Sequence, residues 1–557
     1  MIVTRRTRRH HILLSTLAIA AASATAAHAA PAACAPDAIT ALRIPGVTIA
    51  AASAVPATPA IPEHCLVRGS VTTTGAGAPD GQAGFEMRLP ATWQQRFLFL
   101  GVGGNGGSFT PSANAVDQAA ALGKGYATAI TDTGHQGRNT DASWVIAPDG
   151  KRDTAKITDF FHRAAHQVTV TGKALAEAYY GAKIAHAYFD GCSTGGRMAM
   201  MEAERYPTDY DGIIAGAPAM DYHSLLGRAA MQTAQLASPG AYIPASLLPA
   251  IDKAIRASCA APDGPKDDLI QNPARCAFKP ETMQCKPGQK DDCLSPAQAA
   301  TLRTYLSPVR DAAGRTIYPG MSPSDLAGPR GISSWTVGAT SPDFAKPLAP
   351  WGTDPAAAPA GWSYTRNSLA YWLGRGPDAP ISSLEVNPTT GIATPAAVRE
   401  IDTIFADATT RDPARLQTFI RQGRKMIMYH GFSDPGISPF RTTEFYKQFA
   451  AMRGGYSKAQ ESVRLFMVPG MAHCSGGPGP DSFDTLTALE NWVERRVAPD
   501  AIIATATSPG ATRRTMPLCR FPEQAAYRGT GDLNDAANWS CTPNQALLQS
   551  PAGSAPK

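Results

Sequence analysis

A glycine-rich motif places one serine where it could act as a nucleophile. Residues 191–195, Gly-Cys-Ser-Thr-Gly, follow the apolar run 184–189 and precede the helix-forming run 198–206. Strand, sharp turn and helix in this order are typical of a nucleophile elbow, which lifts the hydroxyl of Ser193 clear of the sheet. The N–H group of Thr194 then points to where an oxyanion would form, so Ser193 is the predicted nucleophile and Thr194 an oxyanion donor. The alternative is a glycine-rich turn that carries an ordinary serine.

Two further residues could activate this serine. A serine hydroxyl needs a base to accept its proton, and the base needs a third group to hold its tautomer. In this topology an acid and then a histidine follow the serine, and Asp434 and His473 stand just beyond the strand-like runs 425–429 and 463–468. Catalytic residues of open parallel sheets lie beyond the carboxyl ends of strands, so we predict Asp434 as the acid and His473 as the base. The alternative for Asp434 is that it merely begins a turn. The alternative for the base is His430, which also follows a strand-like run.

The predicted nucleophile and the predicted base each have a cysteine as a neighbour. Cys192 precedes Ser193, and Cys474 follows His473. If Ser193 and His473 meet, a disulfide between the two cysteines would fasten them together. The chain-entropy model gives so long a loop roughly 5–6 kcal/mol of stabilisation as an upper figure. A rival hypothesis makes Cys192 itself the nucleophile, but export to an oxidising compartment and an even cysteine count argue against a free thiolate.

The N-terminus has the pattern of an export signal. Four arginines between positions 5 and 9 precede the apolar run 12–22, and Ala27-His28-Ala29 offers a cleavage site. We therefore predict that residues 1–29 are a signal peptide and that the protein is secreted or periplasmic. A membrane anchor would need a longer apolar run. Removing four arginines and no acids lowers the formal charge from +6 to +2, which argues against nucleic acid or an anionic membrane as a partner.

At 557 residues the whole chain is too long for one hydrophobic core. After the predicted signal peptide, its composition and patterning change twice. Strand-like and helix-like runs alternate over residues 30–220, which predicts an α/β fold with a mainly parallel sheet. Residues 30–80 are expected to form short strands and loops. Residues 221–422 are rich in Pro, Gly and Asp and contain four cysteines, which indicates an inserted domain. The α/β pattern resumes over 423–557.

A second glycine-rich run, residues 101–107, follows the apolar run 96–100. A phosphate-binding loop is one interpretation, but no Lys-Ser/Thr pair follows the glycines. We interpret the run as a loop whose N–H groups face the nucleophile.

Together these motifs resemble those of the tannase and feruloyl esterase family. The resemblance rests on residues 93–97 before the glycine-rich loop and on residues 191–197, 206–218, 469–479 and 517–541. It extends over nearly all of the chain after the predicted signal peptide. The adjacent Cys-Ser and His-Cys pairs are specific elements of it.

The resemblance implies an α/β-hydrolase core with a large lid, residues 221–422, inserted between nucleophile and acid. It implies that Ser193, Asp434 and His473 form a catalytic triad. It further implies a secreted serine esterase that hydrolyses esters of aromatic carboxylic acids, of hydroxycinnamic, gallic or terephthalic type, through an acyl-enzyme. The expected partner is thus a small aromatic ester. A secreted serine peptidase of the same fold and a non-catalytic polyphenol-binding relative are the alternatives.

The resemblance also suggests which groups face the substrate. The oxyanion donors would be the N–H groups of Thr194 and of one loop glycine, for which we choose Gly104 before Gly103. Arg366 or Arg375 could pair with a substrate carboxylate, although a solvated arginine is the simpler interpretation. Apart from the resemblance, lid aromatic side chains could form a stacking wall, although residues of this kind more often belong to the lid core: Trp335, Phe344, Trp351, Trp362, Tyr371 and Trp372.

Ten cysteines in an exported chain predict five disulfides by their even count. A zinc site is the alternative, and the absence of a Cys-x-x-Cys pair argues against it. The resemblance implies the pairs Cys34–Cys65, Cys192–Cys474, Cys259–Cys276, Cys285–Cys293 and Cys519–Cys541.

The resemblance finally implies a structural calcium ion in the lid. Asp263 and Asp267 match carboxylate positions of the family's loop, and Pro265 and Leu269 match its carbonyl positions. Ala260 stands where the family has a first aspartate. Calcium takes six or more oxygen ligands, so the loss of one carboxylate weakens the site without forbidding it. An acidic turn without a metal is the alternative.

Overall fold

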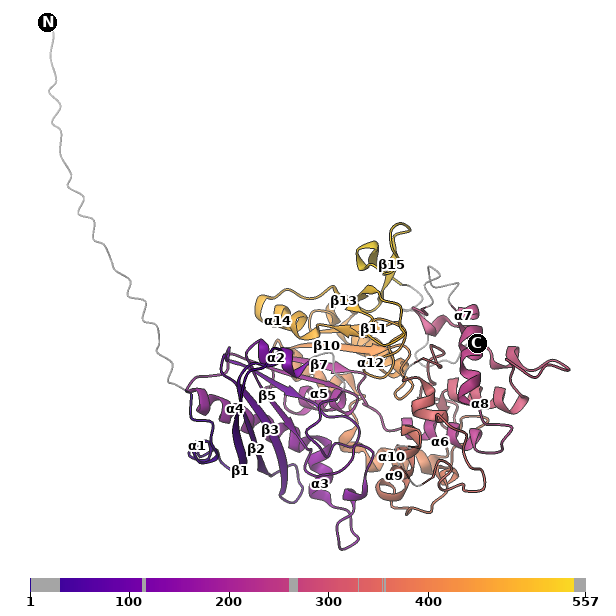
Figure 1. Cartoon of the computed structure of the whole chain (residues 1–557), viewed down its shortest axis with the longest axis horizontal. Helices are drawn as coiled ribbons and strands as arrows, with labels where there is room; N and C mark the ends of the chain where they lie inside the picture. Colours follow the sequence, from indigo (N-terminus) through magenta and orange to yellow (C-terminus); the bar gives the residue numbers. More distant parts are fainter. Residues whose placement is uncertain are drawn as a thin grey trace.

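The computed structural model describes residue 1 and residues 31–112, 117–259, 269–328, 330–352, 354 and 357–544. The predicted signal peptide, residue 1 apart, lies outside these described residues. The largest element is a nine-stranded sheet with the strand order β1-β2-β3-β5-β4-β6-β7-β10-β11 (Figure 1). Its strands are β1 Val47–Val55, β2 His64–Thr73, β3 Gly81–Pro90, β4 Arg96–Leu100, β5 Tyr126–Thr131, β6 His186–Cys192, β7 Gly212–Gly216, β10 Lys425–Gly431 and β11 Val463–Val468.

Strand direction divides this sheet into two parts. Strands β5, β4, β6, β7, β10 and β11 are parallel, whereas β1, β2 and β3 pair antiparallel and β3 joins β5 antiparallel. Every residue of β5, β7 and β11 is buried, as expected for parallel strands covered on both faces. The order and directions are those of an α/β-hydrolase sheet with β1 added at one edge, so the predicted fold class is confirmed.

The N-terminal part of the sheet differs from our expectation of short strands and loops over residues 30–80. There β1 has 9 residues and β2 has 10, and they pair along almost their whole length. Strand β1 is the Ala-rich edge strand and none of its residues is fully buried. The alternation of apolar and polar residues is therefore weak in this segment, which is why the sequence did not reveal its length.

Helices from both halves of the chain pack against the sheet. Helix α4 contacts β2, β3 and β5, helix α5 contacts β6 and β7, and helix α14 contacts β7 and β10. The bounds of the helices outside the insertion are α1 Pro36–Thr40, α2 Gln118–Gly123, α3 Thr154–Thr158, α4 Ala164–Tyr180, α5 Thr194–Arg205, α12 Pro439–Arg453, α13 Tyr456–Ala459 and α14 Thr485–Arg495.

The chain between β7 and β10 builds a separate group of helices. No strand of the described residues in this interval joins the nine-stranded sheet, and helices α6 to α10 lie together to the right of the sheet in Figure 1. Two apolar clusters hold these segments together, and one of them also takes in Trp144, Phe160 and Phe161 from the sheet domain. The boundaries 221–422 stay a prediction. The elements are α6 Ser224–Gln235, α7 Leu248–Cys259, α8 Pro296–Leu306, β8 Val309–Arg310, β9 Thr316–Tyr318, α9 Ala360–Asn367, α10 Pro395–Ile404 and α11 Gln417–Arg421.

Small antiparallel sheets complete the C-terminal part. Strand β13 pairs with β12 and β14, and β15 pairs with β16. Their bounds are β12 Ser482–Phe483, β13 Ala501–Thr505, β14 Thr515–Cys519, β15 Glu523–Tyr527 and β16 Trp539–Pro543. Within the described ranges, none of the helices has the length and apolar character that crossing a membrane requires.

The close approach of β4 to the start of α5 gives a prediction about stability. A Cβ atom at Gly101 would lie 2.6 Å from the Cα atom of Gly195, so backbone would have to move. We expect Gly101→Ala to lower the free energy of unfolding by about 1–3 kcal/mol, the usual cost of overpacking. Gly123→Ala is the matched control, because no heavy atom lies within 4 Å of its added Cβ. Urea unfolding of both variants tests this, and equal midpoints would contradict it.

Candidate active site

Ser193 has the backbone conformation of a nucleophile elbow. It joins β6 to α5 with φ 63° and ψ −122°, a strained combination for a residue with a side chain. Its N–H group donates to Gly216 O at 3.0 Å. The neighbouring glycines are required, because a Cβ at Gly191 would lie 2.4 Å from Gly195 O and one at Gly195 would lie 2.9 Å from Ser112 Oγ. The tight backbone packing therefore holds Ser193 in this conformation.

Asp434 and His473 form a buried hydrogen-bonded pair. His473 Nδ1 donates to Asp434 Oδ2 at 2.7 Å, and the N–H groups of Gly436 and Ile437 donate to Asp434 Oδ1 at 2.7 and 2.9 Å. Burial raises the pKa of Asp434, but the charges and hydrogen bonds of His473 and His430 outweigh it, so the pKa lies below its ordinary value. The carboxylate stays ionised and holds the proton of His473 on Nδ1, which leaves Nε2 as the acceptor.

The two candidate bases have different surroundings. Both ring nitrogens of His430 have partners in the core: Nδ1 lies 2.8 Å from Thr442 Oγ1, and Nε2 lies 3.1 Å from Asp434 Oδ2. His473 lines an open cavity, and Ser193 lines the same cavity. His473 is thus the histidine that shares a cavity wall with Ser193.

The sulfur atoms beside Ser193 and His473 are covalently joined. Cys192 and Cys474 form a disulfide with an S–S distance of 2.05 Å and a Cα–Cα distance of 6.0 Å. Cys192 therefore has no thiol that could act as a nucleophile. The other disulfides are Cys34–Cys65, Cys259–Cys276, Cys285–Cys293 and Cys519–Cys541, so all five pairs are those that the resemblance implies.

The glycine-rich loop lies against the start of α5. Thr194 Oγ1 donates to Gly104 O at 2.6 Å, and both residues line an inner cavity together with Ser193. Gly104 has a φ of +59°, and a Cβ there would lie 2.4 Å from Asn139 O. Because Thr194 is the first residue of α5, its N–H group has no acceptor within the helix. Gly104 and Thr194 are thus brought beside Ser193, and Gly103 lines the outer cavity.

Residues that the sequence analysis did not identify form hydrogen bonds to this loop. Asn105 N donates to Asn139 O at 2.7 Å, and His135 Nε2 donates to Asn105 O at 2.8 Å. The His135 ring stacks on Trp144 at 3.8 Å between centroids. Burial lowers the pKa of His135 to about 4, so the ring is neutral at neutral pH. The sequence signal that could have indicated His135 is its position in a Thr-Gly-His run shortly after a buried strand.

Ser193 lies between two cavities that share a wall. The outer cavity also contains Arg138 and Arg330 in its lining. Four aromatic side chains form part of the wall of the inner cavity: Tyr222, Trp335, Tyr364 and Trp372. Trp335 and Tyr364 line both cavities and stack at 5.8 Å, and Trp335 also contacts the His473 ring edge-on at 5.1 Å.

Only some of the lid aromatic residues predicted to form a stacking wall line the inner cavity. Trp335 and Trp372 line the inner cavity. Trp351 and Trp362 pack against each other at 5.5 Å within an apolar cluster, where Tyr371 also packs. Phe344 lies 6.4 Å from the Tyr242 ring. Tyr222 and Tyr364 complete the wall and were missed, because nothing local distinguishes them from other tyrosines.

The two arginines suggested as substrate contacts are used within the lid. Arg366 donates to the carbonyl groups of Pro377 and Ala379. Arg375 donates to Ser383 O and forms an ion pair with Glu400. Another arginine, Arg228 of α6, lines the inner cavity instead.

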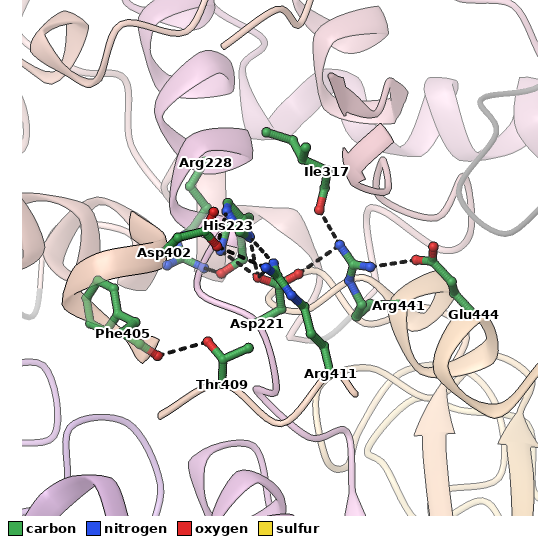
Figure 2. A network of polar contacts seen from close by, with 11 residues as sticks. Asp221, His223, Arg228, Ile317, Asp402, Phe405, Thr409, Arg411, Arg441 and Glu444 are labelled. Atoms are coloured by element: carbon green, nitrogen blue, oxygen red, sulfur yellow. Dashed lines mark hydrogen bonds and ion pairs between the residues drawn. The ribbon is translucent and has the colours of Figure 1, made fainter. Parts of the chain in front are cut away.

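An ion network lies where the insertion leaves and rejoins the sheet domain (Figure 2). Asp221 pairs with Arg441 of α12 at 2.8 Å and with His223 at 2.7 Å, and Arg411 pairs with Asp402 at 2.9 Å. Burial raises the pKa of Asp221, but Arg441 and its other cationic neighbours hold the pKa below its ordinary value. Because Asp221 also lines the inner cavity, the network fixes one edge of that cavity.

The predicted calcium ligands Asp263, Pro265 and Asp267 lie outside the described residues. Leu269 is described and is buried beside Met516 and Trp539. In the part of the chain that the structure covers, His166, Glu202 and Asp209 form a cluster that could hold a metal ion, with ligand atoms within 4.8 Å of one another.

The chain is similar to known proteins over most of its length. A family model described as "Tannase and feruloyl esterase" matches residues 65–542. A mono(2-hydroxyethyl) terephthalate hydrolase of Piscinibacter sakaiensis is 35% identical over 88% of this chain and 87% of its own. A probable feruloyl esterase B of Aspergillus clavatus is 30% identical over 86% of each chain. The solved structure of feruloyl esterase B from Aspergillus oryzae has a TM-score of 0.75 at 25% identity, covering 90% of this chain and 97% of that one.

Two buried histidines give a prediction about pH. Burial lowers the pKa values of His135 and His162 to about 4, against about 6.5 in an unfolded chain. Between these values the unfolded state binds protons that the folded state does not, so each histidine lowers stability by up to ~1.4 kcal/mol per pH unit as pH falls. We expect His162→Gln, which keeps a side-chain polar group beside Tyr206, to show a smaller loss of unfolding free energy from pH 6.5 to 4 than the unmodified protein. Identical losses in urea titrations would contradict this.

Proposed function

This chain belongs to the tannase and feruloyl esterase family and is a carboxylic ester hydrolase, and we propose that it is a serine esterase that cleaves esters of aromatic carboxylic acids. One observation carries the proposal. The strained Ser193 and the Asp434-bound His473 line one cavity, and a disulfide joins their neighbouring residues.

In the proposed acylation step, His473 Nε2 accepts the hydroxyl proton of Ser193 as Ser193 Oγ attacks the ester carbonyl carbon. The carbonyl oxygen becomes an oxyanion, and the N–H groups of Thr194 and Gly104 stabilise it. The ionised Asp434 stabilises the imidazolium form of His473 without accepting its proton. His473 then returns the proton to the leaving alcohol as the C–O bond breaks, which leaves the acyl group on Ser193.

Deacylation repeats these steps with water in place of the alcohol. His473 takes a proton from water, and the resulting hydroxide attacks the acyl carbon of the Ser193 ester. The same N–H groups stabilise the second oxyanion. The proton returns from His473 to Ser193 Oγ as the carboxylic acid leaves.

The aromatic character of the inner cavity supports an aromatic acyl group. A flat ring could pack against the side chains of Trp335, Tyr364 and Trp372, since aromatic pairs prefer stacked or edge-to-face contacts. The printed names of the relatives, a terephthalate monoester hydrolase and feruloyl esterases, also refer to esters of aromatic acids. Family membership favours this function over the peptidase and binding-protein alternatives.

We also propose that the protein is exported and that its lid binds calcium. Five disulfides are typical of proteins in oxidising compartments, which supports a secreted or periplasmic location. The Cys259–Cys276 disulfide closes the loop that carries Asp263, Asp267 and Leu269. Two carboxylates and two carbonyl oxygens are suitable calcium ligands, and water would have to supply the others.

Variants of the two histidines test the proposed mechanism. We expect Ser193→Ala and His473→Gln each to lower kcat for an aromatic methyl ester by about 10⁴-fold or more, since each removes a member of the triad. His430→Gln is the matched control for the base. Its loss should be much smaller, because a glutamine amide can still donate to Asp434 Oδ2 in place of His430 Nε2, and His430 lines neither cavity beside Ser193. Equal losses in the two histidine variants, or high activity in Ser193→Ala, would refute the assignment.

A further inference from the structure

One arginine beside the nucleophile lies between two cavities. Arg228 belongs to α6 and lines the inner cavity, which Ser193 also lines. It also lines an adjoining, smaller cavity. Ser224, Trp335 and Gly436 line both cavities as well, so Arg228 stands at the end of the inner cavity where the second begins.

Within the described ranges, the guanidinium group of Arg228 has no acidic partner. Its Nη1 donates to Ser224 Oγ at 3.2 Å, and its Nε is shielded from solvent without any hydrogen-bond acceptor. None of the ion pairs found among the described residues includes Arg228, although Arg411 and Arg441 of the adjacent network are each paired with an aspartate (Figure 2). Arg228 is thus a cation with unused donors.

The surroundings of Arg228 make its unpaired positive charge energetically unfavourable. Burial lowers its pKa, and only the nearby tyrosines Tyr318, Tyr364 and Tyr222 oppose that shift. Arg228 is half-buried with its Nε inaccessible to solvent, and a charge removed from water without a counter-charge is unfavourable. A planar guanidinium binds carboxylates through two parallel hydrogen bonds, so an anion entering the cavity would remove this cost.

We propose that Arg228 is a specificity residue that binds a second, ionised carboxylate on the acyl group, so that the preferred substrates are monoesters of aromatic dicarboxylic acids. This inference rests on the proposed function. With the ester carbonyl at Ser193 and the substrate ring against the Trp335 and Tyr364 side chains that line the inner cavity, the far end of the acyl group would lie toward Arg228. A neutral phenol at that end would leave the charge of Arg228 uncompensated.

A pair of isosteric substrates tests this inference. The monomethyl ester of benzene-1,4-dicarboxylic acid and methyl 4-carbamoylbenzoate have nearly the same shape but differ in charge. We expect kcat/KM of the unmodified protein to favour the carboxylate by about 10- to 100-fold, the range that hydrogen bonds to charged groups supply. In Arg228→Gln this ratio should fall to near one. Arg228→Lys should keep part of it, because the charge remains but the bidentate geometry is lost.

Arg315→Gln is the matched control for net charge. Arg315 is an exposed arginine of the insertion, paired with Asp311, and it lines neither cavity beside Ser193. Its variant should keep the ratio of the unmodified protein. A ratio near one in the unmodified protein, or an unchanged ratio in Arg228→Gln, would overturn the inference while leaving the esterase function intact.

A binding measurement separates this inference from the proposed function. Isothermal titration of Ser193→Ala with the same two methyl esters needs no turnover, and only the monomethyl ester of benzene-1,4-dicarboxylic acid carries a carboxylate. We expect this monoester to bind at least tenfold more tightly than methyl 4-carbamoylbenzoate, and the additional variant Arg228→Gln to abolish the difference. Equal affinities would overturn the role of Arg228, whatever esters the enzyme hydrolyses.

Discussion

The disulfide between Cys192 and Cys474 is the constraint on which the arrangement of the site depends. It joins two residues 282 positions apart, one before Ser193 and one after His473. The loops at the ends of β6 and β11 are thereby fixed relative to each other, although β7 and β10 separate the two strands in the sheet. In our account this bond keeps nucleophile and base together, while the insertion between them forms its own group of helices that packs against the sheet domain.

Backbone packing and charge then set the conformations of Ser193 and His473, which the disulfide brings together. The glycines around Ser193 allow β4, β6 and α5 to approach so closely that the serine stays in a strained conformation. The buried carboxylate of Asp434 orients His473 on one side. On the other side, the network of Asp221 and Arg441 ties the start of the insertion to α12 and so positions one edge of the inner cavity. Reactivity would thus come from the sheet domain, and selectivity from the insertion.

The sequence was informative where a function depends on local motifs. Ser193, Asp434 and His473 each follow a buried strand, so their spacing predicted their places at one end of a parallel sheet. It was uninformative where a role depends on distant contacts. Arg366 and Arg375 looked as available as any lid arginine, yet both bind lid carbonyl groups. Nothing in the local sequence distinguishes Arg228 from other arginines, and only the three-dimensional structure reveals that it lines a cavity and has no acidic partner among the described residues. The Ala-rich strand β1 was underestimated for a related reason, because an exposed edge strand leaves little hydrophobic alternation.

The central claim is that Ser193, activated by His473, is the residue that carries the acyl group. Covalent labelling with an aryl fluorophosphonate, followed by mass spectrometry of the proteolytic peptides, tests it most directly. We predict one label per chain, on the peptide that contains Ser193, and a strongly reduced labelling rate in His473→Gln. A label on another residue, or full esterase activity in protein that the reagent does not label, would contradict the account.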